Sequence, residues 1–228
     1  MRSVATNAKE SLSRDRLKLV MPPRPPAAAL DSTPPSTRTS RPPPQPAPLM
    51  KGIGFANVKR YVLSQHDSQH WENTLALLNP ADRRVVESAV AVGWYDVLVF
   101  ARLIRAIDKA CGSGNLDLLR QIGAFEVEQD LNRVLRLFLR ILSPANIFLA
   151  EGKIWSHFQS AGRWTSIQVP GGVDATLTGW AIDTALCKEL AGYLEKLLQC
   201  AGAQAPHVGH TECQALGAPS CVFRYRWK

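Results

Sequence analysis

Between about residues 71 and 158, apolar residues recur at three- and four-residue steps, which is the spacing of amphipathic helices. Asn79 and Pro80 are residue types that favour the start of a helix, and Gly93 interrupts the pattern that follows. Ser143 and Pro144 open another helix in the same way. The predicted helices cover residues 71–78, 79–92, 94–110, 116–142 and 144–158. Gly123 is the weak point of the helix predicted over 116–142.

The pattern changes to alternation in the last third of the chain, and alternation is typical of half-buried strands. Two alternating runs, 164–169 and 173–180, flank a Pro-Gly-Gly turn and predict a hairpin. A helix to about Cys200 follows, and then two further strands over 207–212 and 221–227. The predicted fold class is α+β, with a helical N-terminal half packed on a four-stranded antiparallel sheet in the order helices, hairpin, helix, hairpin.

Composition separates residues 1–49 from the rest. This segment has no aromatic residue and holds 11 of the 16 prolines, so we expect a disordered tail. Residues 50–228 are expected to form a single domain, and Met50 is a candidate start of the functional protein. The tail also holds eight Lys or Arg against three Asp or Glu, so much of the basic charge lies there. Such arms bind phosphate without sequence preference, and we therefore expect no specific nucleic-acid partner.

The chain shows neither a run of apolar residues long enough for a membrane span nor a signal-peptide pattern at its start. Its five cysteines are an odd number scattered over a long sequence, which does not suggest a disulfide framework. We therefore expect a soluble, cytoplasmic protein.

Three cysteines and one histidine of the C-terminal region are candidate metal ligands. Cys213 and Cys221 lie at the two ends of one hairpin connection, His210 is three residues before Cys213, and Cys187 lies on the inward face of the preceding helix. Such a set suits a closed, tetrahedral zinc site. Strand alternation places His210 and Cys213 on opposite faces unless a β-bulge intervenes, with Glu212 as the competing ligand. The alternative is that these are buried thiols and a hydrogen-bonded histidine.

Residues 212–223, read Glu-Cys-Gln-Ala-Leu-Gly-Ala-Pro-Ser-Cys-Val-Phe, resemble the terminal Cys, Gly, Cys, Phe signature of 4-vinyl reductase domains. That superfamily includes aromatic-sensing domains of bacterial activators and is related in fold to TRAPP subunits. The resemblance implies a structural zinc on Cys187, Cys213 and Cys221, with His210 in place of an acid. The folded part as a whole resembles a myxobacterial paralogous family more closely.

The resemblance also suggests a ligand pocket. Ala191 and Val208 stand where phenol sensors have pocket tyrosines, so a phenol is not the expected ligand. We expect a more apolar pocket between helices and sheet. Its predicted lining is Trp155, Phe158, Trp164 and Trp180. The alternative is that these aromatic residues are plain core.

The sequence does not point to an enzyme, since it shows no nucleophile with a base, no convergent carboxylate pair and no open metal site. The leading hypothesis is a stand-alone regulatory or sensory domain that binds a small apolar ligand and signals through a protein partner or as a homodimer. The alternative is a protein-protein interaction scaffold with a filled core. Its binding face would include the stripe of Arg133, Arg136 and Arg140.

Overall fold

The structure is a computed structural model that describes residues 47–131 and 143–228. The predicted tail therefore lies outside the described residues except for its last three positions. The arginine stripe of Arg133, Arg136 and Arg140, together with the end of the predicted helix 116–142, also lies outside them.

The first half of the domain is helical, as the spacing of apolar residues predicted. Asn79 caps its helix by accepting hydrogen bonds from the backbone amides of Ala81 and Asp82, and Ser143 caps another through Asn146. The helices are α1 (Ile53–Gln65), α2 (Ser68–Ala76), α3 (Pro80–Ser88), α4 (Val97–Cys111), α5 (Leu118–Asp130), α7 (Pro144–Leu149) and α8 (Glu151–Phe158).

A small two-stranded sheet, β1 (Leu49–Lys51) with β2 (Trp94–Asp96), was not predicted. Met50 pairs with Tyr95 across it, so the expected helix over 94–110 begins only at Val97. The side chain of Asp96 accepts the amide hydrogen of Leu98 and thereby caps α4. The sequence pattern missed this strand because three residues are too few to show alternation.

The second half contains a four-stranded antiparallel sheet, which confirms the predicted fold class. Its strands are β3 (Arg163–Val169), β4 (Gly172–Thr178), β5 (His207–Glu212) and β6 (Cys221–Arg226), in the order β3-β4-β6-β5. Helix α9 (Thr184–Cys200) connects the two hairpins.

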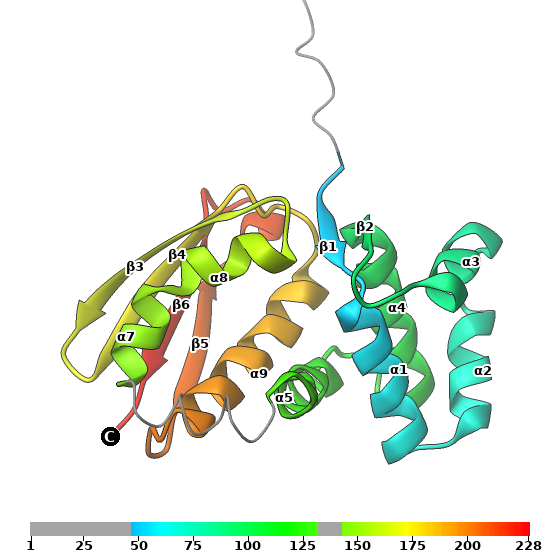
Figure 1. Cartoon of the computed structure of the whole chain (residues 1–228), viewed down its shortest axis with the longest axis horizontal. Helices are drawn as coiled ribbons and strands as arrows, with labels where there is room; N and C mark the ends of the chain where they lie inside the picture. Colours follow the sequence, from blue (N-terminus) through cyan, green and yellow to red (C-terminus); the bar gives the residue numbers. More distant parts are fainter. Residues whose placement is uncertain (1–46, 132–142) are drawn as a thin grey trace, which may run out of the picture. The chain divides into compact units, whose positions relative to one another are not determined.

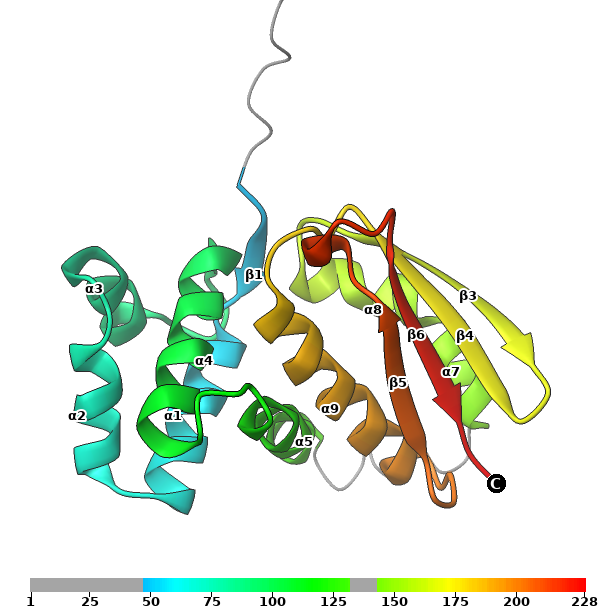
Figure 2. The ribbon, with the colours of Figure 1, turned by 180° about the vertical axis from the view of Figure 1, so that it is seen from behind.

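One face of this sheet is covered by helices. Along β6 the side chains of Cys221, Phe223 and Tyr225 are buried, while Arg224 is exposed. Helices α7 and α8 lie over β3 and β4, and α9 packs along β5 (Figure 1). Seen from behind, the opposite face of the sheet has no described helix over it (Figure 2). This one-sided burial explains the alternation that the sequence shows.

Helices α5 and α9 approach each other closely at two glycines. A side chain on Gly123 would lie 2.1 Å from the carbonyl oxygen of Glu189, and one on Gly192 would lie 2.1 Å from that of Arg120. Only glycine fits at such distances. Gly123, the expected weak point of its helix, is therefore a packing position.

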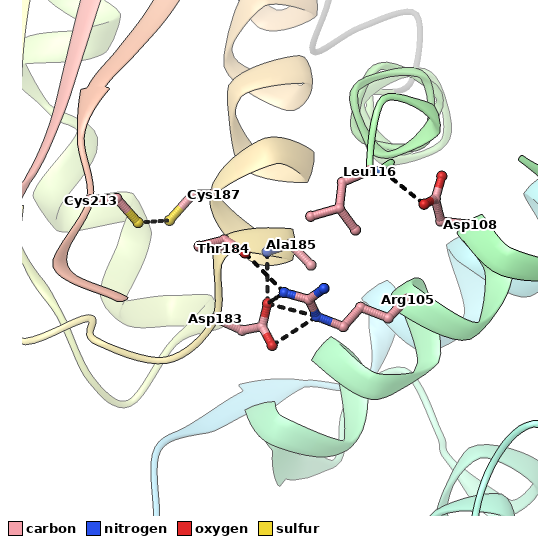
Figure 3. Close-up of polar contacts among 8 residues, drawn as sticks. All are labelled: Arg105, Asp108, Leu116, Asp183, Thr184, Ala185, Cys187 and Cys213. Atoms are coloured by element: carbon pink, nitrogen blue, oxygen red, sulfur yellow. Dashed lines mark hydrogen bonds and ion pairs between the residues drawn. The ribbon is translucent and has the colours of Figure 1, made fainter. Parts of the chain in front are cut away.

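The start of α9 is anchored to α4 by an ion pair. Arg105 donates to both carboxylate oxygens of Asp183, and Asp183 accepts the amide hydrogen of Ala185 at 2.7 Å (Figure 3). One carboxylate thus caps α9 and joins it to the helical half. None of the helices among the described residues combines the length and apolar character needed to cross a bilayer.

Candidate functional site

The four predicted metal ligands lie together in the structure. Cys187 comes from α9, His210 from β5, Cys213 from the turn after β5, and Cys221 from the start of β6. One ligand atom from each lies within 4.8 Å of all the others. The Cys187 sulfur is 3.8 Å from the sulfurs of both Cys213 and Cys221, and Figure 3 shows the first of these contacts.

A β-bulge makes this arrangement possible. The pairing of β5 with β6 shifts register between His210 and Glu212, which leaves one extra residue in β5. The shift offsets the alternation that would otherwise place His210 and Cys213 on opposite faces of the strand. The imidazole ring also stacks on Phe223, with centroids 4.6 Å apart. Glu212, the competing ligand expected from the sequence, is exposed and stays outside the cluster.

The three thiols are buried, and Cys187 lies within hydrogen-bonding distance of the other two. The hydrogen bond with Cys187 holds the pKa of the Cys221 thiol below its usual range, and the backbone amide of Gln214, which donates to the same sulfur at 3.2 Å, adds to this. The pKa of Cys187 is raised by the same hydrogen bond and by burial. His210 Nε2 is buried without a hydrogen-bond partner among the described residues. Three sulfurs and one imidazole in this arrangement could hold a thiophilic metal ion.

A separate cavity of about 160 Å³ lies between the N-terminal helices and the layer formed by α7, α8 and α9. Three of the four predicted pocket residues, Trp155, Phe158 and Trp180, line it. Trp164 does not, because it packs in the core against Trp155 and Phe223, with ring centroids 5.6 and 5.4 Å apart. The described lining comes from helices, β1 and loop positions rather than from the four strands of the sheet.

Carboxyl groups in this cavity were missed by the sequence reasoning. Glu126 and Asp130 of α5, Glu189 of α9 and Glu151 of α8 all line it. A signal existed for Glu126, since it continues the buried face marked by Leu119 and Ile122 on the same helix. A charged residue on the buried face of a helix is unusual and points to a functional role.

Burial disfavours the ionised form of these carboxyl groups. It raises the pKa of Glu126 well above its usual value, and the nearby Glu189 adds to the shift. Burial also raises the pKa of Glu189 and Asp130. For Glu151, which is 9% exposed, burial raises the pKa to about 8 although Tyr225 donates a hydrogen bond to it at 2.9 Å. Burial therefore favours the protonated form of all four carboxyl groups.

Comparison with solved structures identifies the fold. An H-NOX protein from S. oneidensis, solved in its Fe(II)NO ligation state, has 15% sequence identity and a TM-score of 0.61, and the match covers 78% of this chain and 99% of that protein. An unliganded Fe(II) H-NOX protein from K. algicida has 12% identity and a TM-score of 0.61, with coverages of 78% and 97%. The chain has the H-NOX fold. No protein-family model and no curated protein sequence matches the chain.

These findings correct two expectations. The kinship with 4-vinyl reductase and TRAPP-like domains, and with the myxobacterial family, is wrong, because the matching structures are H-NOX proteins. The C-terminal signature that suggested it covers a single hairpin, and the geometry of one hairpin recurs in unrelated families. The expected zinc cofactor is overturned as well. The metal named for the proteins of this fold is iron, and another matching structure comes from work on haem distortion in the H-NOX family.

The residues of this cavity do not fit a haem. Protein ligands of haem iron are histidine, cysteine, methionine or tyrosine side chains. Neither the histidines nor the cysteines of the chain line the cavity, and all of them lie in its described part. The histidines are His66, His70, His157, His207 and His210.

Two other residue types do not change this result. Tyr193 lines the cavity, but burial and neighbouring carboxyl groups raise its pKa well above the usual value, so it stays a phenol bound to Asp130 at 3.2 Å. Met50 is the other haem-ligand type among the described lining residues, and it packs against Gly54. The cavity volume of about 160 Å³ is also below the roughly 300–1,000 Å³ typical of sites for drug-sized ligands.

Proposed function

We propose that this chain is a sensor domain that takes a small ligand into the cavity between α1, α5, α8 and α9. The observation that carries the proposal is the cavity itself. It lies within an H-NOX fold, and most of its wall is apolar or aromatic. The solved proteins of this fold are described in liganded and unliganded states, which supports a ligand-binding role.

The alternative hypothesis, a protein-protein interaction scaffold, requires a filled core, and the cavity is evidence against it. Gln159 Oε1 and Trp180 Nε1 on the cavity wall are buried without a hydrogen-bond partner among the described residues. Unsatisfied buried polar atoms cost stability, and a bound ligand can satisfy them. A partner protein or a second copy of the chain in the cytoplasm would then bind the liganded form in preference to the empty form.

Native mass spectrometry of the full chain, purified from its own cells, tests this proposal. We expect the intact mass to exceed that of the polypeptide by one small organic molecule, which leaves on denaturation. The melting temperature of the emptied protein should rise when that molecule is returned. A chain that carries nothing, and whose melting temperature ignores a broad library of small molecules, would favour the scaffold hypothesis instead.

We also infer that Cys187, His210, Cys213 and Cys221 form a structural metal-binding site. The support is the mutual proximity of the four ligand atoms, their burial and the unpartnered Nε2 of His210. A metal ion here would tie α9 to the β5-β6 hairpin and would add its binding energy to the stability of the fold.

Elemental analysis of purified protein is expected to find one equivalent of a thiophilic metal ion per chain. Cys213→Ser should abolish it and lower the melting temperature, because one of the ligands is lost. Cys200→Ser, which changes a partly buried cysteine outside the cluster, is the matched control and should retain the metal. Metal-free protein as stable as the metal-treated protein would reject the site.

A further inference from the structure

The polar groups of the cavity gather where α5 and α9 face each other. Glu126 of α5 and Glu189 of α9 both line the cavity and lie close enough to influence each other's pKa. One turn along, Asp130 accepts hydrogen bonds from Asn57 at 2.8 Å and from Tyr193 at 3.2 Å. The wall thus presents three carboxyl groups from two helices, and the side chain of Glu126 is only 4% exposed.

Cations of the chain do not neutralise the Glu126–Glu189 pair within the described part. Lys51 lines the cavity, but its ammonium group donates to the carbonyl of Val92 at 3.0 Å and lies 4.3 Å from the ring centroid of Trp94. Arg60 lies near Asp130 but hydrogen-bonds to Gln129 at 2.8 Å. Buried carboxyl groups are usually paired with a cation or bound to a metal. Among the described residues, no cation plays this part for Glu126 and Glu189.

The rest of the wall suits the body of an organic cation. Phe100, Phe148, Trp155 and Trp180 line the cavity, and aromatic faces attract cations as well as hydrocarbon. Trp180 is 2% exposed, and its indole Nε1 has no hydrogen-bond partner in the described part of the chain. The indole N–H is a donor, so it can bind an acceptor atom on the body of a ligand but not an ammonium group. It is a second, independent polar atom of the wall that no described residue satisfies.

We propose that the cavity binds a small protonated organic amine whose nitrogen is held by Glu126 and Glu189 and whose hydrocarbon body lies against the aromatic wall. The proposal rests on the proposed function and names the ligand class for the same cavity. Its small volume limits the ligand to a molecule below drug size.

Proton release should accompany amine binding. In the empty cavity burial favours the protonated form of the carboxyl pair, whereas a bound ammonium group favours the ionised form. Affinity should therefore rise with pH until the free amine begins to lose its own proton. Among the described residues, the other titratable or charged groups near the pair are Lys51 of β1, Arg60 of α1, Asp130 of α5, Glu151 of α8 and Tyr193 of α9.

Isothermal titration calorimetry on the full chain, with matched probes, tests the proposal. Benzylamine, benzyl alcohol and benzoate have nearly the same size and differ in charge, and a set of alkyl amines and alcohols of equal chain length extends the comparison. We expect each amine to bind about tenfold or more tightly than its alcohol, the typical gain from a charge-assisted hydrogen bond, and benzoate not to bind. Titrations in two buffers of different ionisation enthalpy should show proton release.

Variants of Glu126 and Glu189 test whether these two residues hold the amine nitrogen. Glu126→Gln and Glu189→Gln should each weaken amine binding about tenfold and leave alcohol binding unchanged, because an amide cannot ionise. Both should fold, since an amide resembles the protonated carboxyl that it replaces. Glu128→Gln, on the same helix but bound to Lys196 at 2.6 Å outside the cavity, is the control and should bind amines as the wild type does.

Three outcomes separate the possibilities. Amines that bind no better than alcohols would overturn the amine proposal and leave the ligand-binding function standing with a neutral ligand. Preference for benzoate would overturn it as well. Failure of all probes to bind the wild-type chain would count against both the amine and the proposed function.

Discussion

At the scale of single residues, the molecule concentrates its unusual chemistry in buried carboxyl groups. Glu151 shows this most clearly. Its carboxyl group lies between the cavity and the sheet, where it accepts a hydrogen bond from the buried hydroxyl of Tyr225. Burial raises the pKa of Glu151 from 4.5 to about 8 because the charged form loses its hydration. A carboxyl group of this kind makes the stability of the fold depend on pH.

Between pH 4.5 and about 8 the folded state holds the Glu151 proton while the unfolded state has released it. The free energy of unfolding should therefore fall as pH rises through this range, by at most about 1.4 kcal/mol per pH unit for one group. Glu151→Gln should remove this part of the slope. Urea unfolding at pH 5, 6, 7 and 8 measures it. Glu87→Gln, the same change on the exposed surface, should follow the wild type; parallel curves for the Glu151 variant and wild type would refute the assignment.

The sequence revealed the sulfur cluster but not the carboxyl groups, and the reason is physical. Cys213 and Cys221 are held near each other by one short hairpin, so local spacing suffices to place them. Glu126 and Glu189 are far apart in the sequence and meet only because two helices pack together. Spacing within a single helix could mark Glu126 as unusual, but it could not supply its partner.

At the scale of elements, the contact between α5 and α9 positions the cavity. Both helices contribute carboxyl groups to it, and Gly123 and Gly192 allow their backbones to approach. Periodicity predicted these helices, and alternation predicted the strands of the sheet. Neither pattern could predict the β-bulge at His210 and Glu212 or the short strand β1, because both depend on pairing with a distant segment.

Gly192→Ala should destabilise the domain although alanine favours helices. The added methyl group would lie 2.1 Å from the carbonyl oxygen of Arg120, so the helices must separate, and overpacking of this kind costs about 1–3 kcal/mol. Gly152→Ala is the matched control within α8, because there the methyl group meets its nearest neighbour at 3.6 Å. That variant should be neutral or up to about 1 kcal/mol more stable. Equal free energies of unfolding for the two variants would show that α5 and α9 are less closely packed.

At the scale of the whole molecule, the chain combines the H-NOX fold with a cavity whose described lining includes neither histidine nor cysteine. Fold and ligand are thus separate properties, and the site decides the chemistry. The described wall of the cavity carries carboxyl groups, and none of the chain's histidines lines it.

Haem should therefore fail to bind in the cavity. When haemin is titrated into the purified chain, we expect the absorption spectrum to remain that of free haemin, because no histidine or cysteine lines the cavity to ligate the iron. A haem-binding H-NOX protein treated in the same way provides the positive control. A saturable spectral change with one haem per chain would contradict this prediction.

The central claim is that a small molecule occupies the cavity between α1, α5, α8 and α9. Amide chemical shifts of the isotope-labelled full chain, recorded with and without a bound molecule found by native mass spectrometry or by the amine series, test it most directly. The largest shifts are predicted at Gly54, Glu126, Leu190 and Tyr193, which line the cavity from three helices. Shifts confined to residues outside it, such as the exposed Val92 and Ile167, would contradict the claim.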